Sequence, residues 1–303
     1  MVEVLGKGVC LENRRCWRSA ENGYGELNTA TWMMGALVSL CTMAIGAREL
    51  SGEINLFQVL FSRSVIGLGV ITFLIYRSQG SILFSTSRLK MHVGRNVFHF
   101  GGQYGWFVGL GLLPLAEVFA IEFTTPVWTV LIAAVFLKEP LTVRKLCAVL
   151  LGLVGVYVIL APSSGINWGS IVVLGASVCF AISYSVTKSL SNTESPLTIL
   201  FYMCLVQLPM GLLLVGSNWV MPNIVQWFWI GIIGLAALTT HYCITRALIL
   251  SDAGVVITLD FLRLPLIAMV GVLFYSEDFE ITLLIGAAIM LLGNLINVLK
   301  TNK

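Results

Sequence analysis

The long apolar stretches of this sequence contain several charged residues, among them Arg63, Glu122, Asp260 and Arg263. A charged side chain at the centre of a bilayer costs about 2.5–3.5 kcal/mol on insertion scales, so it normally faces a cavity or a partner charge. Asp260 and Arg263 are three residues apart, which places them on one face of a helix. Together the four residues could bind a charged or zwitterionic metabolite, and either carboxylate could take up a proton. The alternative is that the charges pair with one another and only lock the helices together.

A second set of polar side chains follows one face of a single apolar segment. His99, Gln103 and Trp106 are separated by four and three residues, which is the spacing of one helix face. Gln103 could donate hydrogen bonds to a ligand, and Trp106 could stack on a ring. Hydrogen bonding between helices explains the same residues equally well. Tyr184 is a single polar group in another apolar run, where packing and ligand contact both stay open.

Glu117 and Glu122 are the two carboxylates of one apolar stretch, PLAEVFAIEFTTPVW (114–128). Residues five apart on a helix point in directions that differ by roughly 140°. The two glutamates therefore cannot share one face. We expect Glu122 to lie deep in the membrane and Glu117 to lie near the outer end of the helix.

The composition predicts an integral membrane protein. The 303 residues are 57% hydrophobic and 11% charged, whereas soluble globular proteins contain about 25% charged residues. The mean hydropathy is +0.91, and the net charge of +3 is too small to indicate a nucleic-acid partner. The seven cysteines are scattered singly without metal-ligand spacing, so we expect no disulfide framework, no metal site and no cofactor.

Apolar runs long enough to cross a bilayer alternate with short polar breaks. A helix needs about 20 apolar residues to cross about 30 Å of hydrocarbon, and lipid cannot satisfy the free backbone groups of other structures. We therefore predict an all-α fold with ten transmembrane helices, at 30–47, 55–76, 94–112, 115–136, 143–160, 168–187, 196–216, 224–245, 253–275 and 281–299.

The positive charges give these helices an orientation. With the N-terminus in the cytoplasm, fifteen Lys and Arg residues fall on the inner side and one, Arg48, falls on the outer side. This bias follows the positive-inside rule and predicts that both termini lie inside. Residues 1–28 are polar and are expected to form a cytoplasmic tail, or to be an artefact of an upstream start site.

The two halves of the chain resemble each other. FLKEPLTVRKLCAVLLGLVGVYVIL (136–160) aligns with FYSEDFEITLLIGAAIMLLGNLINVL (274–299). This alignment predicts two five-helix repeats, 29–162 and 163–303. Because five is odd, the second repeat enters the membrane with the opposite polarity.

Inverted repeats of this kind are typical of transporters, whose substrate site lies near the midplane between the halves. The alignment carries Phe136 onto Phe274, and we call this constant shift in residue number the repeat offset. The repeat offset also carries Glu122 onto Asp260. The sequence therefore predicts that the two carboxylates lie close to the same central site.

Three segments carry a family resemblance: LPLAEVFAIEFTTPVWTVLIAAVFLKEPLTVRKLCAVLLGLVGVYVILAP (113–162), LFSRSVIGL (60–68) and INWGSIVVLGASVCFAISYSVTKSL (166–190). They resemble the drug/metabolite transporter superfamily, in its EamA-type branch, over roughly residues 30 to 300. The resemblance implies ten helices in two inverted five-helix repeats, a central cavity and alternating access. An arginine in the segment of Arg63 is a recurring feature of similar transporters. The acidic turn YSEDFE (275–280) departs from the family pattern.

We expect a secondary transporter of a small polar metabolite, driven by a gradient because the sequence has no ATP-binding motif. The mixed charges suit an amino acid or an S-adenosylmethionine-like compound, and the aromatic residues would also suit a flat molecule such as riboflavin or a nucleobase. An enzyme is not expected, since HExxH, GxSxG and clustered metal ligands are missing from the sequence. A channel or structural subunit is the alternative of another class, although no filter-like repeat is visible.

The expected partners are the lipid bilayer, a small-molecule substrate and, as a candidate coupling ion, a proton. A monomer and a homodimer both stay open. The resemblance implies a multi-pass location in a bacterial inner membrane. The sequence does not distinguish uptake from export.

Overall fold

The protein is described by a computed structural model, which covers residues 25–77, 85–136, 142–160, 167–190, 193–250, 259–260, 262–278 and 281–298. Every regular element in these residues is a helix. Six helical stretches are long and apolar enough to cross a membrane, and shorter apolar helices accompany them. The chain is therefore a multi-pass membrane protein, while the count of ten spans and their orientation stay predictions.

The helices are α2 (Gly25–Glu49), α3 (Leu56–Arg77), α4 (Leu89–Leu112), α5 (Leu115–Glu122), α6 (Thr125–Phe136), α7 (Val143–Leu160), α8 (Trp168–Leu190), α9 (Pro196–Val215), α10 (Ile224–Leu250), α12 (Arg263–Tyr275) and α13 (Ile281–Val298). The apolar stretch of α2, Thr29–Glu49, matches the predicted first span at 30–47, whereas the predicted start of the third span, at residue 94, was too late because α4 begins at Leu89. The first turns of α4 contain polar residues that are nevertheless buried, among them His92 and Arg95. Hydropathy alone reads such residues as a polar break.

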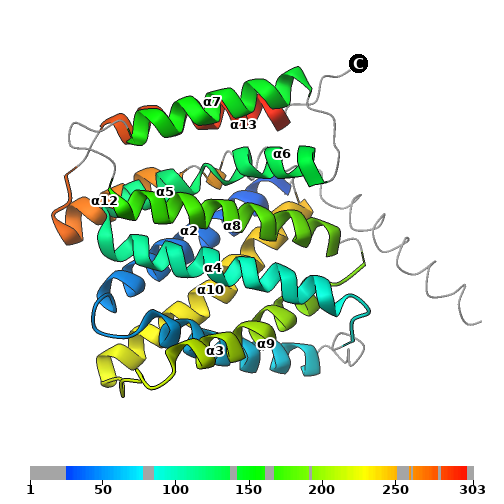
Figure 1. The fold of residues 1–303 in the computed structure, drawn as a ribbon, viewed down its shortest axis with the longest axis vertical. Coiled ribbons are helices and arrows are strands. Elements are labelled where there is room, and N and C mark those ends of the chain that lie inside the picture. Colours follow the sequence, from blue (N-terminus) through cyan, green and yellow to red (C-terminus); the bar gives the residue numbers. More distant parts are fainter. Residues whose placement is uncertain are drawn as a thin grey trace, which may run out of the picture.

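The helices stack in layers along the long axis of the molecule (Figure 1), with α7 and α13 at one end and α3 and α9 at the other. The most extensive helix pairs are α2 with α10, α4 with α8, α3 with α9 and α7 with α13. The repeat offset relates α2 to α8 and α4 to α10. The α2–α10 pair is then the counterpart of the α8–α4 pair, which is the pattern that a two-fold relation between the halves would produce.

The span predicted at 115–136 is present, since Leu115–Ile132 is long and apolar enough to cross a membrane, but a break at Phe123 and Thr124 divides it into α5 and α6. Pro126 lies in the first turn of α6, where its missing N–H interrupts the hydrogen bonds that would continue α5. The hydroxyl of Thr125 donates to the carbonyl oxygen of Glu122 at 2.6 Å and so satisfies one group that the break leaves open. The break places Glu122 at the end of a helix inside the bundle.

Only part of the predicted helix at 253–275 lies within the described residues, namely the helical residues 259–260 and the helix α12. The helix α12 begins at Arg263, with Pro265 in its first turn, while residues 251–258 and 261 lie outside the described residues. The equivalent regions of the two halves therefore each contain a proline at the start of a helix. Interrupted helices of this kind bring polar groups to the middle of transporter bundles.

Close packing of α4 on α8 fixes the helix that carries most of the polar residues. A Cβ atom on Gly105 would lie 3.0 Å from the Cβ of Ala176 and 3.2 Å from the carbonyl oxygen of Val172. Small residues let helix backbones approach closely in membranes, where lipid supplies no hydrophobic drive for association. The face of α4 that carries His99 and Gln103 is held in place by this contact.

Glu277 ties together the ends of three helices on the side that the sequence predicts to be outer. Its Oε1 accepts a hydrogen bond at 2.8 Å from Arg48, which also donates to the carbonyl oxygen of Leu113 at 2.6 Å. Its Oε2 accepts from the backbone N–H of Leu115, the first residue of α5, at 2.8 Å. One carboxylate therefore joins the end of α2, the start of α5 and the loop after α12.

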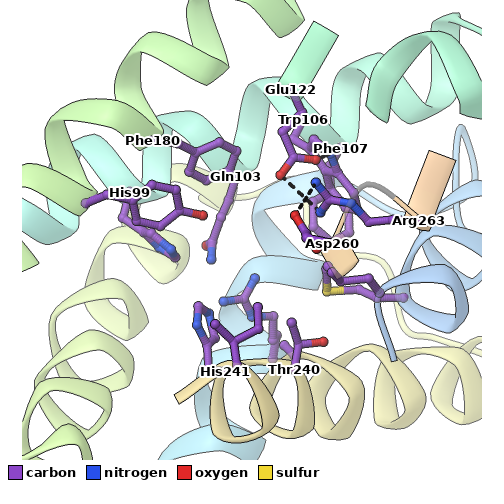
Figure 2. Close-up of a pocket in the computed structure, with 16 residues that line it drawn as sticks. His99, Gln103, Trp106, Phe107, Glu122, Phe180, Thr240, His241, Asp260 and Arg263 are labelled. Atoms are coloured by element: carbon purple, nitrogen blue, oxygen red, sulfur yellow. Dashed lines mark hydrogen bonds and ion pairs between the residues drawn. The ribbon is translucent and has the colours of Figure 1, made fainter. Parts of the chain in front are cut away.

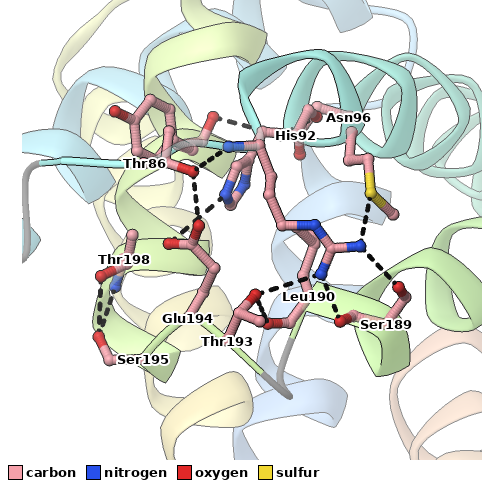
Figure 3. Close-up of polar contacts among 12 residues, drawn as sticks. Thr86, His92, Asn96, Ser189, Leu190, Thr193, Glu194, Ser195 and Thr198 are labelled. Carbon is pink, nitrogen blue, oxygen red and sulfur yellow. Dashed lines mark hydrogen bonds and ion pairs between the residues drawn. The ribbon is translucent and has the colours of Figure 1, made fainter.

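A second polar cluster joins α4, α8 and α9 at the predicted inner side (Figure 3). Arg88 donates to the carbonyl oxygen of Ser189 at 2.8 Å and to its hydroxyl at 2.9 Å. The hydroxyl of Thr86 donates to Glu194 at 2.5 Å, and Nε2 of the buried His92 lies 3.9 Å from the same carboxylate. Each end of the bundle thus has polar contacts between different helices.

Substituting Glu277→Gln should loosen the outer end of the bundle. The amide keeps an acceptor for the N–H of Leu115 but removes the charge opposite Arg48, so we expect the free energy of unfolding to fall by about 1–3 kcal/mol. Thermal unfolding in detergent would measure the change. Asp278→Asn is the matched control, because Asp278 is exposed. Equal stability of both variants would contradict the proposed role of Glu277.

Candidate functional site

A cavity of about 250 Å³ lies at the centre of the bundle (Figure 2). It is lined by side chains from α2, α3, α4, α5, α8, α10 and α12, together with Asp260. All eight residues that the sequence singled out are among them: Arg63, His99, Gln103, Trp106, Glu122, Tyr184, Asp260 and Arg263. The structure therefore brings the predicted residues together around one space, and their roles stay proposals.

Arg263 stands between the two carboxylates of the cavity. Its Nη1 lies 3.5 Å from Oε1 of Glu122, and its Nη2 lies 3.5 Å from Oδ2 of Asp260. The guanidinium carbon also lies 5.0 Å from the ring centroid of Phe119 and 4.6 Å from that of Phe123. An arginine held by carboxylates and aromatic faces keeps its charge in a poorly solvated place.

The two carboxylates differ in their remaining contacts. Oε2 of Glu122 accepts a hydrogen bond from the indole N–H of Trp106 at 2.9 Å. Oδ1 of Asp260, in contrast, is buried and has no hydrogen-bond donor within the part of the chain that the structure describes. Asp260 therefore keeps one acceptor atom to which no described residue donates.

Arg63 lies apart from these carboxylates, although the sequence grouped all four charges together. In the amide orientation that satisfies its neighbours, the Gln103 oxygen accepts hydrogen bonds from both Nη atoms of Arg63, from Nη1 at 2.8 Å. The same amide donates to Gln207 at 3.0 Å, and Nδ1 of His99 lies 2.9 Å from Nε2 of Gln207. The cavity thus has a carboxylate side, around Arg263, and an amide and imidazole side, where Gln103 contacts Arg63. Figure 2 shows Arg263 with the two carboxylates apart from His99 and Gln103.

Aromatic rings cover part of the cavity wall. Trp106, Phe107, Phe180 and Tyr184 all line it, and the rings of Phe180 and Tyr184 are stacked with centroids 6.1 Å apart. Tyr184 is 44% exposed, as expected for a side chain that faces an open space rather than a packed core. These rings offer flat apolar surfaces beside the charged groups.

Eight further lining residues were not predicted to belong to the site: Leu40, Met43, Phe107, Phe180, Ala237, Thr240, His241 and Ile244. Of these, His241 was expected to serve packing between helices more than ligand contact. The internal repeat contains the signal that could have found three of them. The repeat offset carries the stripe of His99, Gln103 and Trp106 onto Ala237, His241 and Ile244 of α10. Applying the offset to the polar stripe, and not only to the carboxylates, predicts this second wall.

Glu117 does not take part in the cavity. Its Oε1 accepts a hydrogen bond from the hydroxyl of Ser170 at 2.7 Å, which joins α5 to the start of α8. Across the described residues, no group of three or more His, Cys, Asp or Glu side chains could hold a metal ion. The chemistry available in the cavity is therefore that of ion pairs, hydrogen bonds and aromatic contact.

Comparison with known families gives a match to both halves of the chain. The model of the EamA-like transporter family matches residues 27–161 and again residues 167–299.

Curated relatives and solved structures extend this match. The chain is 23% identical over 262 residues to an S-adenosylmethionine uptake transporter of Rickettsia bellii, which covers 86% of this chain and 89% of the relative. It is 27% identical over 273 residues to a riboflavin transporter of Vibrio cholerae, which covers 88% of this chain and 91% of the relative. A crystal structure of another protein matches with a TM-score of 0.62 at 18% identity, over 89% of this chain and 96% of the other, and supports a shared fold.

Replacing Arg263 by glutamine should destabilise the protein strongly. The change leaves two buried carboxylates without their cation, and removing one partner of a buried ion pair typically costs about 3–5 kcal/mol. Adding Glu122→Gln to Arg263→Gln should restore part of the lost stability, because it removes one of the two orphaned charges. Unfolding in detergent measures both changes. Arg77→Gln, at the exposed end of α3, is the control. A single Arg263→Gln variant as stable as this control would contradict the role of the ion pairs.

Proposed function

The chain belongs to the EamA-like transporter family, and on that premise we propose that it is a gradient-driven carrier that moves a small polar metabolite across a bacterial inner membrane by alternating access. The observation that supports this proposal most directly is the central cavity with Arg63, Glu122, Asp260 and Arg263 in its wall. Charges that a membrane protein keeps in its interior generally mark a substrate or ion pathway.

The cavity lies where a carrier needs its binding site. It is bordered by α5 and α12. Pro126 lies just after the break that ends α5, and Pro265 lies in the first turn of α12. In transporters, interrupted helices at the interface of two repeats form substrate and ion sites near the midplane, around which the halves rock. The two repeats, 29–162 and 163–303, would be the moving halves here.

The polar contacts at the two ends of the bundle suit alternating access. Arg48 contacts Glu277 at one end, and Arg88 contacts Ser189 at the other. These contacts join exposed or partly exposed groups, so each can open at a modest cost in free energy. Opening one end at a time would expose the cavity to one side of the membrane and then to the other.

A proton is the proposed coupling ion. Protonation of Glu122 or Asp260 would remove one negative charge beside Arg263, and the ion pairs at 3.5 Å would change strength. Because the arginine bridges α5 and α12, such a change would alter how firmly the two halves of the cavity wall are held together. This link between charge and helix contact is what proton coupling requires.

Two kinds of substrate are compatible with the wall of the cavity. Its mixed charges suit an amino acid or a compound like S-adenosylmethionine, which the relative from Rickettsia bellii takes up. Its rings, Trp106, Phe107, Phe180 and Tyr184, would also suit a flat aromatic molecule such as riboflavin, which the relative from Vibrio cholerae transports.

Neutralising either carboxylate of the cavity should impair transport more than it impairs folding. In proteoliposomes preloaded with a pooled metabolite extract, we expect Glu122→Gln and Asp260→Asn each to slow counterflow of labelled solute by about tenfold or more, since a hydrogen bond to a charged group contributes about 1.5–3 kcal/mol. Glu53→Gln is the control, because Glu53 is exposed and contacts Gln226. Normal counterflow in both cavity variants would rule out the proposed site.

A further inference from the structure

The most unusual charge in the cavity is Arg63, because it is buried and has no counter-ion among the residues that the structure describes. Its α3 position leaves it 6% exposed, and its guanidinium donates to the neutral amide of Gln103. Within the described residues, the ion pairs of the cavity all involve Arg263, and no carboxylate lies within 4 Å of Arg63. The carboxylates Glu122 and Asp260 are both engaged on the other side.

A second buried arginine adds to the same positive side. Arg95 is 3% exposed and donates to Asn96 at 2.7 Å and to Thr187 at 3.1 Å, both neutral groups. Asn96 in turn lies 3.5 Å from the amide of Gln207, which contacts His99. Two positive charges are therefore connected only through neutral amides, hydroxyls and an imidazole, as far as the described residues show.

Burial of a charge without an opposite charge is unfavourable, because the lost hydration is not replaced by an ion pair. A guanidinium is also the group best suited to hold a carboxylate, with which it forms paired, charge-assisted hydrogen bonds. Arg63 is fixed by Gln103 with its head group at the cavity wall. An anionic group of a bound molecule would supply the counter-charge that the described residues do not provide.

The carboxylate side of the cavity has too few positive charges and hydrogen-bond donors for its acids, as far as the described residues show. Two carboxylates share one arginine there, and Oδ1 of Asp260 is buried without a donor among the described residues. An ammonium or another cationic group next to Asp260 would satisfy this oxygen. Figure 2 shows Asp260 and Glu122 with Arg263 on one side of the cavity and His99 with Gln103 on the other, so the two deficits lie apart within one space.

We propose that the transported molecule is a zwitterion whose carboxylate pairs with Arg63 and whose cationic group pairs with Asp260. This inference rests on the proposed function, since it assigns the substrate class of the same cavity. It favours a compound of the amino-acid type over an uncharged flat ring. The aromatic wall then contacts the side chain or ring that lies between the two charged groups.

The first experiment compares charged and uncharged probes in counterflow with wild-type protein and Arg63→Gln. The probes are the twenty L-amino acids and S-adenosylmethionine as zwitterions, with riboflavin and adenine as flat molecules that lack the pair of opposite charges. We expect the wild type to exchange one or more zwitterions, and Arg63→Gln to lower the apparent affinity for them on the order of tenfold to hundredfold. Arg77→Gln, the same change at the exposed end of the same helix, should behave as the wild type.

The methyl ester of each exchanged amino acid tests which group Arg63 recognises. The ester lacks the carboxylate charge, so it should compete weakly in the wild type, and Arg63→Gln should change its competition little. Equal losses of affinity for the amino acid and its ester in Arg63→Gln would overturn the assignment of the carboxylate to Arg63.

The variant Gln103→Glu tests the missing counter-ion without removing Arg63. The new carboxylate would pair with Arg63 inside the protein, so thermal stability should rise while zwitterion affinity falls. A merely structural role of Gln103 would move stability and affinity in the same direction. A Gln103→Glu variant that is less stable than the wild type, or that binds zwitterions normally, would overturn the proposal.

The outcomes separate this inference from the proposed function. Exchange of riboflavin or adenine, with no exchange of any zwitterion, would leave the carrier function standing and refute the zwitterion. Exchange of no probe by folded wild-type protein would refute both, because the cavity would then not be a transport site for either class.

Discussion

The central constraint on this structure is that a charge inside an apolar helix bundle needs a partner. Arg263 meets this constraint with Glu122 and Asp260, each at 3.5 Å, and with the rings of Phe119 and Phe123. Because Glu122 belongs to α5 and Arg263 to α12, their pairing fixes how these two helices lie against each other. The position of the cavity follows from this contact.

The interruption of the helices helps to bring the buried charges to their partners. In a straight helix through 115–136, Glu122 would lie in the middle of the helix. The break before Pro126 instead places its carboxylate at the end of α5, beside Arg263. The close contact of α4 with α8 at Gly105 then holds the polar face of α4 toward the same space. Packing, backbone interruption and charge pairing therefore act together to build one polar cavity inside an apolar protein.

Much of the site could be predicted from the sequence, because charged residues are rare in segments that cross a membrane. Arg63, Glu122, Asp260 and Arg263 stand out in apolar runs, and an internal repeat links the two carboxylates. The spacing of Asp260 and Arg263 places them on one helix face, but the contact of Arg263 with Glu122 could not be predicted, since it depends on the distance between helices far apart in the chain. The structure separates Arg63 from the acids that the sequence grouped with it.

The helix pattern shows the same limit. The all-helical fold follows from composition and the length of the apolar runs, but the break at Phe123 and Thr124 does not. Membrane helices tolerate proline when neighbours satisfy the freed backbone groups, so Pro126 alone is compatible with a kinked helix or with two helices. The early start of α4 was missed because its buried polar residues resemble a loop in a hydropathy profile.

The most direct test of a carrier with one central cavity is trans-stimulation in sealed proteoliposomes. Vesicles containing the wild-type protein are preloaded with a labelled solute that the protein exchanges, and efflux is followed with and without the same unlabelled solute outside. A carrier that exposes one cavity to each side in turn predicts efflux that speeds up with external solute and saturates. Efflux that rises linearly with concentration and ignores the external solute would contradict alternating access and indicate a pore.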